Sequence, residues 1–329
     1  MRTNRRVLAA AVWLMGVPML VAGPQETPVE AGQRAYEAGD YKKAIAILQA
    51  AAAKDARNGD IQLLLTKSYL ETNQVDAAVS SAEKAVAINP KNSVYHDWLG
   101  QAYGEKASHA SIFSAYPLAR KTQKEFETAV QLDERNFDAM RHLIDYDCSA
   151  PSIVGGGEDK ARPLIQKLMS MDAAQGHYAE GNCRIQKKDF AGAEAEFAKS
   201  LASKPKSMEL IYEMASYFGN RGQGEQVLEA ANAAQAIAPN DPRVMLIRAI
   251  GWILKDEKLS EAEKNLREYL RLAPAGPGYP GPWLAHYWLG RLSEGQNNVA
   301  AAREQYQAAL KLNGKYKNAQ EALKRLGSR

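Results

Sequence analysis

The residues that could do chemistry are few and widely spaced. The carboxylates are scattered at helix-surface spacing, and no serine or cysteine has the context of a nucleophile elbow. None of the five histidines stands in a His-Glu-x-x-His pair or another metal-ligand spacing; they are His96, His109, His142, His177 and His286. We therefore predict no enzyme activity, no metal and no cofactor.

Three consecutive glycines, residues 155–157, precede an expected helix start at Glu158. Backbone N–H groups in such a place can hold an anion. No Gly-Lys-Ser/Thr follows and no strand precedes, so the Walker and dinucleotide patterns are absent. Glu158 and Asp159 already bring negative charge to that helix end. A structural turn is the favoured interpretation, with a ligand-binding loop as the alternative.

Cys148 and Cys183 are the only cysteines. In an oxidising compartment two cysteines can pair, whereas in a reducing one they would be small buried residues. Both fall late in the first helices of successive repeat units, so they could approach. A disulfide needs Cα atoms about 4.4–6.8 Å apart. A zinc site with His177 lacks a fourth ligand.

The elements that would position these residues repeat every 34 residues. Leu65 recurs as Leu99 and Tyr69 as Tyr103. Between them, Ala78, Ala82 and Ala85 mark a second helix that Asn89-Pro90 ends. A fixed period of this length indicates a solenoid of helical hairpins, in which each unit buries its apolar face against its neighbours.

The segments HDWLGQAY (96–103), GDYKKAI (39–45), KKDFAGAEAEFAKSLASKP (187–205) and HYWLGRLSEGQNNVAAAREQYQAAL (286–310) resemble the tetratricopeptide repeat. This resemblance implies an all-α, right-handed superhelical solenoid that binds other proteins. A long third unit followed by a Ser-Ala-Pro…Gly-Gly-Gly turn is similar to a subset of bacterial exported repeat proteins, for which it implies no activity.

We expect the solenoid domain to span residues 24–329 in about eight units, with a capping helix near 317–327. The units are 25–58, 59–92, 93–136, 137–173, 174–207, 208–241, 242–282 and 283–316. Insertions are predicted near 104–122, 149–159 and 273–283. The last of these is too rich in proline and glycine to be helical, and we expect it to be exposed.

Residues 1–23 are predicted to be an export signal. Arg2, Arg5 and Arg6 precede an apolar stretch, residues 7–22, that is interrupted by Gly16 and Pro18. This stretch is shorter than the roughly 20 residues of a bilayer span. We therefore expect a mature chain without a stable transmembrane span, located in the periplasm or cell envelope. Without these three arginines the formal charge falls from +4 to about +1, which gives no electrostatic case for nucleic-acid binding.

The concave side of a repeat array is its expected binding surface. Matching the units to the repeat pattern predicts the following lining residues: Asp97, Gln101, Arg141, Asp145, Tyr178, Asn182, Tyr212, Ser216 and Asn220. This polar and aromatic set suits an extended peptide or a partner's helix, although it could be a solvated face. We interpret the protein as a scaffold or adaptor for a protein or peptide partner. The alternative is a binding protein for cell-wall glycan or another small ligand.

Overall fold

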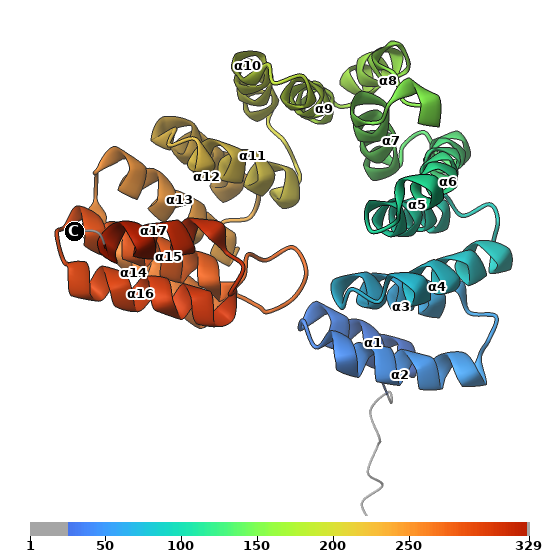
Figure 1. The fold of residues 1–329 in the computed structure, drawn as a ribbon, viewed down its shortest axis with the longest axis horizontal. Coiled ribbons are helices and arrows are strands. Elements are labelled where there is room, and N and C mark those ends of the chain that lie inside the picture. Colours follow the sequence, from blue (N-terminus) through green and yellow to red (C-terminus); the bar gives the residue numbers. More distant parts are fainter. Residues whose placement is uncertain (1–25, 328–329) are drawn as a thin grey trace, which may run out of the picture.

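The computed structural model describes residues 26–327, which form seventeen α-helices and one short 3₁₀ turn. The predicted signal, residues 1–23, lies outside the described residues. Eight helical pairs follow one another around an arc (Figure 1), and the last helix covers the end. The predicted all-α solenoid with a C-terminal cap is confirmed. Among the described residues, no helix is long and apolar enough to cross a membrane.

The first helices of the pairs are α1 (Pro28–Glu37), α3 (Gly59–Glu71), α5 (Ser93–Ser108), α7 (Phe137–Ser149), α9 (Ala173–Gln186), α11 (Met208–Asn220), α13 (Pro242–Lys255) and α15 (Pro282–Gly295). The second helices are α2 (Tyr41–Lys54), α4 (Val75–Ile88), α6 (Ile112–Leu132), α8 (Glu158–Met171), α10 (Phe190–Ala202), α12 (Gly224–Ile237), α14 (Leu259–Leu272) and α16 (Val299–Leu312). The final helix is α17 (Lys317–Gly327).

Side-chain caps begin many of the first helices. The Asn58, Asn92 and Asn136 side chains each accept a hydrogen bond from the backbone N–H three residues later. Such caps satisfy N–H groups that have no partner within the helix. The sequence therefore sets the start of α3, α5 and α7 locally.

Close packing within a pair depends on a small residue in the first helix. A Cβ on Gly100 would lie 2.6 Å from the Phe126 ring, and one on Gly290 would lie 2.5 Å from the Tyr306 ring. Phe126 and Tyr306 come from the second helices and are buried. This contact explains why the first helix carries a glycine at this position, because no larger side chain leaves room for the ring.

The three predicted insertions differ in form. The third unit lengthens both its helices: α5 has 16 residues and α6 has 21, with Pro117 inside α6. The fourth unit ends α7 in a 3₁₀ turn, η1 (Ser152–Val154), and the three glycines. The seventh is a loop, residues 273–281, because Pro282 and Trp283 belong to α15. The predicted non-helical boundary at 283 is thus two residues too late, since proline is well suited to the first turn of a helix.

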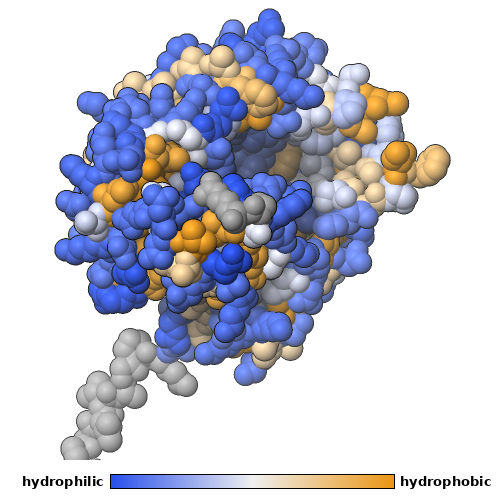
Figure 2. Space-filling view, turned by 60° about the vertical axis from the view of Figure 1, so that its left-hand side comes forward, coloured by the Kyte–Doolittle hydropathy of each residue, from blue (hydrophilic) through white to orange (hydrophobic). Residues whose placement is uncertain are grey.

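The loop of residues 273–281 was expected to be exposed, but part of it is buried. Gly276 and Pro280 are buried. A Cβ on Gly276 would lie 1.6 Å from the Glu37 carbonyl oxygen, so the loop backbone touches the C-terminal end of α1. Figure 1 shows the loop between α14 and α15 reaching toward α1. The arc is therefore closed by a contact between its first and seventh units. Most of the face in Figure 2 is hydrophilic, with apolar residues in separate patches.

Candidate binding surface on the first helices

The predicted lining residues come from four successive first helices. Asp97 and Gln101 lie on α5, and Arg141 and Asp145 lie on α7. The α9 and α11 helices carry the others, which are Tyr178, Asn182, Tyr212, Ser216 and Asn220. These helices lie on the inner side of the arc (Figure 1). We call this set and the residues bonded to it the inner surface.

Asp97 is not open to solvent, contrary to its expected place on an accessible face. Asp97 is only 3% exposed to solvent. One carboxylate oxygen lies 2.8 Å from His142 Nδ1, and the other accepts a hydrogen bond of 3.0 Å from Gln101. Burial opposes the charged form of His142, but the Asp97 carboxylate outweighs burial and raises the pKa of His142. Asp97 therefore joins α5 to α7 from within.

Tyr178 is also more buried than expected, at 8% exposure. Its hydroxyl donates to the Glu213 carboxylate on α11, and burial together with Glu213 raises its pKa. The Arg141 guanidinium lies 5.7 Å from the centre of the Tyr178 ring and pairs with Asp138. Arg141 Nε is buried and has no hydrogen-bond partner among the described residues. Tyr178 and Arg141 thus connect α7, α9 and α11.

Asp145 lies at the centre of this network. Burial raises the pKa of its carboxyl group to about 6, even though His142 and Arg141 favour the charged form. Glu213 raises the pKa further, and a hydrogen bond from Asn182 lowers it. Burial thus outweighs the neighbouring cations, so the Asp145 carboxylate would be stabilised by a further cationic group.

The remaining predicted residues lie farther along α11. Tyr212 is half-buried, and burial raises the pKa of its hydroxyl to about 12. Ser216 is half-buried, whereas Asn220 is exposed at the helix end. Neither has a side-chain hydrogen bond within residues 26–327 in the structure. The two residues are therefore available to a partner.

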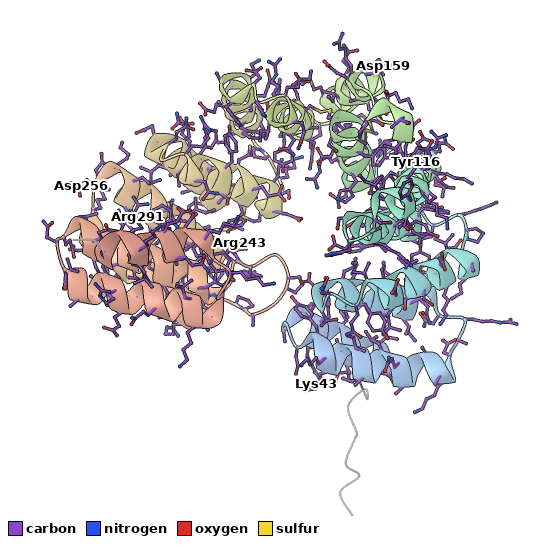
Figure 3. All side chains as sticks on the ribbon, in the orientation of Figure 1. Lys43, Tyr116, Asp159, Arg243, Asp256 and Arg291 are labelled. Carbon is purple, nitrogen blue, oxygen red and sulfur yellow. A yellow bond between two sulfur atoms is a disulfide. The ribbon has the colours of Figure 1, made fainter. Side chains whose placement is uncertain are left out.

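Three residues were not predicted from the sequence. They are His142 and Glu213 on the inner surface, and Arg243, which holds the loop of residues 273–281. His142 and Glu213 adjoin Arg141 and Tyr212 in sequence, and only their contacts distinguish them. Arg243, at the start of α13, donates to the Gly278 carbonyl at 2.9 Å and lies 4.6 Å from the Tyr279 ring centre. It also pairs with Asp241 at 2.6 Å. Arg243 stands beside the α14–α15 loop (Figure 3), so it fixes that loop from the inside.

The structure contains a disulfide between Cys148 and Cys183. Their Cα atoms are 5.3 Å apart, and the bond joins the end of α7 to α9. His177 Nδ1 lies 2.7 Å from the Glu196 carboxylate. The two cysteines are bonded to each other, and His177 pairs with Glu196, so these three side chains do not form the zinc site considered from the sequence. No group of three or more candidate metal ligands occurs in residues 26–327.

The glycine turn is filled by the protein's own side chains. The Gly155 carbonyl accepts hydrogen bonds of 2.8 Å from Gln123 and 2.6 Å from Lys160. A Cβ on Gly156 would lie 2.0 Å from the Ala150 carbonyl oxygen. The N–H groups of Gly155 and Gly157 donate to the Ser152 and Asp147 carbonyls, so the turn already uses two of the groups that would hold an anion, which supports the interpretation as a structural turn.

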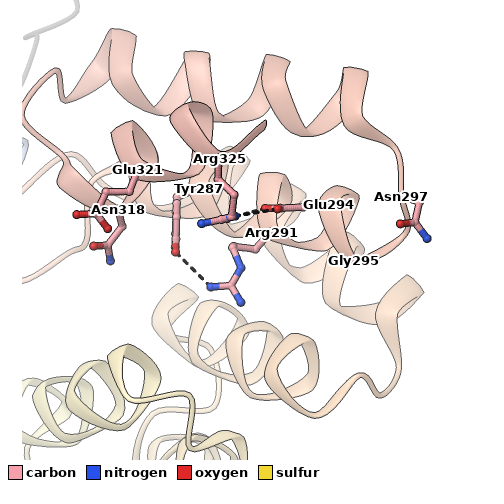
Figure 4. Close-up of a pocket in the computed structure, with 8 residues that line it drawn as sticks. All are labelled: Tyr287, Arg291, Glu294, Gly295, Asn297, Asn318, Glu321 and Arg325. Atoms are coloured by element: carbon pink, nitrogen blue, oxygen red, sulfur yellow. Dashed lines mark hydrogen bonds and ion pairs between the residues drawn. The ribbon is translucent and has the colours of Figure 1, made fainter. Parts of the chain in front are cut away.

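A polar cavity of about 630 Å³ lies between α15 and α17 (Figure 4). Arg291 enters it, donating to the Tyr287 hydroxyl at 3.3 Å, and its guanidinium lies 5.5 Å from the Trp288 ring centre. Arg325 on α17 pairs with Glu294 on α15 at 2.8 Å and so joins the two walls. Asn318 and Glu321 complete the other side. The cavity offers both donors and acceptors, as a small polar ligand would require.

Comparison with known proteins agrees with this architecture. Family models described as tetratricopeptide repeat match residues 35–102 and residues 254–319. The chain is a tetratricopeptide-repeat protein. No curated protein matches its sequence.

Several solved structures are similar to this tetratricopeptide-repeat chain. A thermophilic TPR protein of Thermus thermophilus is 18% identical, with 56% of this chain and 93% of that chain covered and a TM-score of 0.46. A tetratricopeptide repeat protein from Parabacteroides merdae is 13% identical, with coverage of 92% and 98% and a TM-score of 0.43. The human IFIT1 dimer with m7Gppp-AAAA is 16% identical, with coverage of 92% and 62% and a TM-score of 0.52. At this identity the last likeness shows a shared fold alone.

Proposed function

We propose that the protein is a non-catalytic scaffold that binds a segment of a partner protein on its inner surface. Tetratricopeptide repeats serve protein–protein interaction in general, and their fold typically lacks catalytic activity. The observation that carries the proposal is the Asp145 carboxylate, which lies among Arg141, His142 and Asn182 and keeps a pKa of about 6. A half-buried carboxylate with a raised pKa is stabilised by a cation that arrives with a ligand.

This environment favours a partner segment with a lysine or arginine. Its cation would approach the Asp145 and Glu213 carboxylates. Glu213 raises the pKa of Asp145, and both carboxylates raise the pKa of Tyr178. The half-buried Tyr212 and Ser216 on α11 extend the same surface for the neighbouring residues of the segment. Tyrosine supplies apolar contact area and a polar end at the same position, as binding surfaces for peptides commonly require.

We further propose that the protein is exported and works in a bacterial periplasm or cell envelope. The arginines and the apolar stretch of residues 7–22 support export. The Cys148–Cys183 disulfide agrees with an oxidising compartment, where such bonds persist. No nucleic-acid partner is proposed, because the chain without residues 1–23 is close to neutral.

Site-directed photocrosslinking in cells tests the proposal. A photoreactive amino acid replaces Ser216 on the inner helix α11 or, as a control, the exposed Glu229 on the outer helix α12. The proposal predicts one discrete crosslinked protein from position 216 and none from position 229. Crosslinks of the same proteins from both positions would contradict binding on the inner surface.

The second candidate is binding of a cell-wall glycan or another small polar ligand. The polar cavity between α15 and α17 favours it, because Arg291, Tyr287 and Asn318 can all hydrogen-bond to hydroxyl or carboxyl groups. Titration with soluble peptidoglycan fragments, followed through Tyr and Trp fluorescence, tests it. Saturable binding that the Arg291→Met variant loses would support this function, and no response to the fragments would exclude it.

A further inference from the structure

We propose that the tip of the α5–α6 hairpin binds the surface of an anionic lipid bilayer. Ile112 is 86% exposed and Phe113 is 91% exposed, and these are the two most exposed large apolar residues of the part described. Tyr116, one turn later, is 45% exposed. Large apolar side chains gathered in water mark a surface that meets another apolar phase. Figure 2 shows a hydrophobic projection at the right-hand edge of a mostly hydrophilic face.

The repeat fold does not require this apolar tip. Two other turns between paired helices are polar, Asn73-Gln74 between α3 and α4 and Lys188-Asp189 between α9 and α10, whereas the α7–α8 turn exposes Ile153 to a lesser extent. The α5–α6 pair is longer than the other pairs, because α6 alone has 21 residues. Phe113 therefore lies beyond the packed part of the hairpin and contributes almost nothing to its core. Its exposure is consistent with a role outside the fold.

Cations predominate behind the tip, in a stretch that Glu105 and Glu125 border on either side. Residues 106–124 contain four cations, Lys106, Arg120, Lys121 and Lys124, and no aspartate or glutamate. Lys106 pairs with Asp76 on α4, whereas Arg120, Lys121 and Lys124 are exposed. Lys160 joins these three along a shallow cavity of about 450 Å³, whose only acidic lining residue is Glu127. This distribution complements lipid phosphates.

The spacing of tip and cations matches the layers of a bilayer surface. Arg120 follows Phe113 by seven residues, which is about 10 Å along a helix. Interfacial segments bury their apolar side chains roughly 5–10 Å into the boundary between headgroups and acyl chains. With Ile112 and Phe113 at that depth, Arg120 and Lys121 lie at the phosphates, and Tyr116 lies between them. Aromatic side chains favour that intermediate level.

This order also distinguishes a bilayer from an acidic protein partner. Both would attract the cations, but a bilayer presents its headgroups and its apolar interior in successive layers. Here the apolar groups precede the cations along the axis of α6. An apolar end followed by a cluster of long, flexible cations fits a layered interface, where lysine and arginine extend back toward the headgroups.

A fluorophore at the tip of the full chain tests the proposal. Because Cys148 and Cys183 are bonded to each other, a Ser114→Cys variant carries one free thiol, which is labelled with nitrobenzoxadiazole. The matched control carries the label at Ser170→Cys on α8, also exposed. Each protein is mixed with vesicles of phosphatidylcholine alone or with 30% phosphatidylglycerol. We expect a blue shift and at least a twofold rise in emission at position 114 only, and only with phosphatidylglycerol.

Two further variants of the Ser114→Cys protein separate the two parts of the surface. Ile112→Ser with Phe113→Ser should abolish the response, and Arg120→Ser with Lys121→Ser should shift it to higher phosphatidylglycerol content. An equal response at positions 114 and 170 would overturn the proposal, because it would indicate binding through another part of the chain. No response at position 114 would also overturn it.

Discussion

A Cβ on Gly39 would lie 2.1 Å from the carbonyl oxygen of Ala275, although 236 residues separate the two along the chain. Gly39 stands in the turn between α1 and α2 with a φ of +72°, and Ala275 lies in the loop after α14. The loop is held from the other side by Arg243 at Gly278 and by Tyr269 at Pro280, whose carbonyl accepts at 2.5 Å. The first and seventh repeats are thus joined through backbone, and the inner surface lies within a closed arc.

The closure predicts different effects for two similar glycine substitutions. Gly39→Ala should open the arc, because its Cβ collides with Ala275, whereas Gly222→Ala should not. Gly222 has a φ of +74°, so both variants carry the same backbone strain of about 1 kcal/mol, but nothing lies within 4 Å of a Cβ at Gly222. Small-angle X-ray scattering should show a larger radius of gyration for Gly39→Ala alone, and proteolysis within residues 273–281 should accelerate. Equal radii for the two variants would contradict the closure.

The disulfide should stabilise the irregular fourth repeat. Removing it in Cys148→Ala/Cys183→Ala frees a segment with a sequence separation of 35 residues. From the chain entropy of a loop of this length, we expect the free energy of unfolding to fall by on the order of 3–4 kcal/mol. Denaturant unfolding of this variant beside the unreduced chain measures the loss. The bond carries little of the stability if the two unfolding midpoints coincide.

Two glycines of α15 should respond oppositely to alanine. Gly290→Ala places a Cβ 2.5 Å from the buried Tyr306 ring and should cost about 1–3 kcal/mol. Gly295→Ala meets nothing within 4 Å and should be neutral or slightly stabilising, because alanine favours a helix. Thermal unfolding followed by circular dichroism compares them. Similar melting temperatures would mean that the α15–α16 pair is packed less closely than described.

Asp145 should make stability depend on pH. Burial raises its pKa from 3.8 to about 6, so the folded state keeps this proton at pH values where the unfolded state has lost it. The free energy of unfolding therefore falls as pH rises from about 4 through 6, by roughly 3 kcal/mol at most for this group. The neighbouring charges are His142 and Arg141 on α7 and Glu213 on α11.

Asp145→Asn should remove that part of the pH dependence. Relative to the unchanged chain, the variant should gain stability between pH 4 and pH 7, as urea unfolding at each pH would measure. Asp147, whose pKa burial also raises to about 6, leaves a residual dependence in both proteins. Parallel stability curves for the two proteins would show that Asp145 is charged at low cost.

The repeat architecture could be predicted because the sequence of each unit contains the local signals for its own helical hairpin. The 34-residue period and the Asn89-Pro90 helix end are local signals, and the approach of Cys148 to Cys183 follows from the stacking of successive units. The burial of Asp97 could not be predicted, since it depends on how α5 and α7 cross at His142. Likewise, the contact of Gly39 with Ala275 depends on the summed curvature of seven repeats, to which every unit adds a small rotation.

The most direct test of the proposed function compares how tightly two variants bind the partner protein that is crosslinked at position 216. One variant is changed on the inner surface and the other on the outer helix. Asp145→Asn keeps the shape of the side chain and removes its charge, and Glu229→Gln makes the same change on the outer helix α12. At pH 7.5 we expect Asp145→Asn to weaken binding about tenfold, the effect of losing one hydrogen bond to a charged group, and Glu229→Gln to leave Kd unchanged. An unchanged Kd for Asp145→Asn, or a loss confined to Glu229→Gln, would contradict binding on the inner surface.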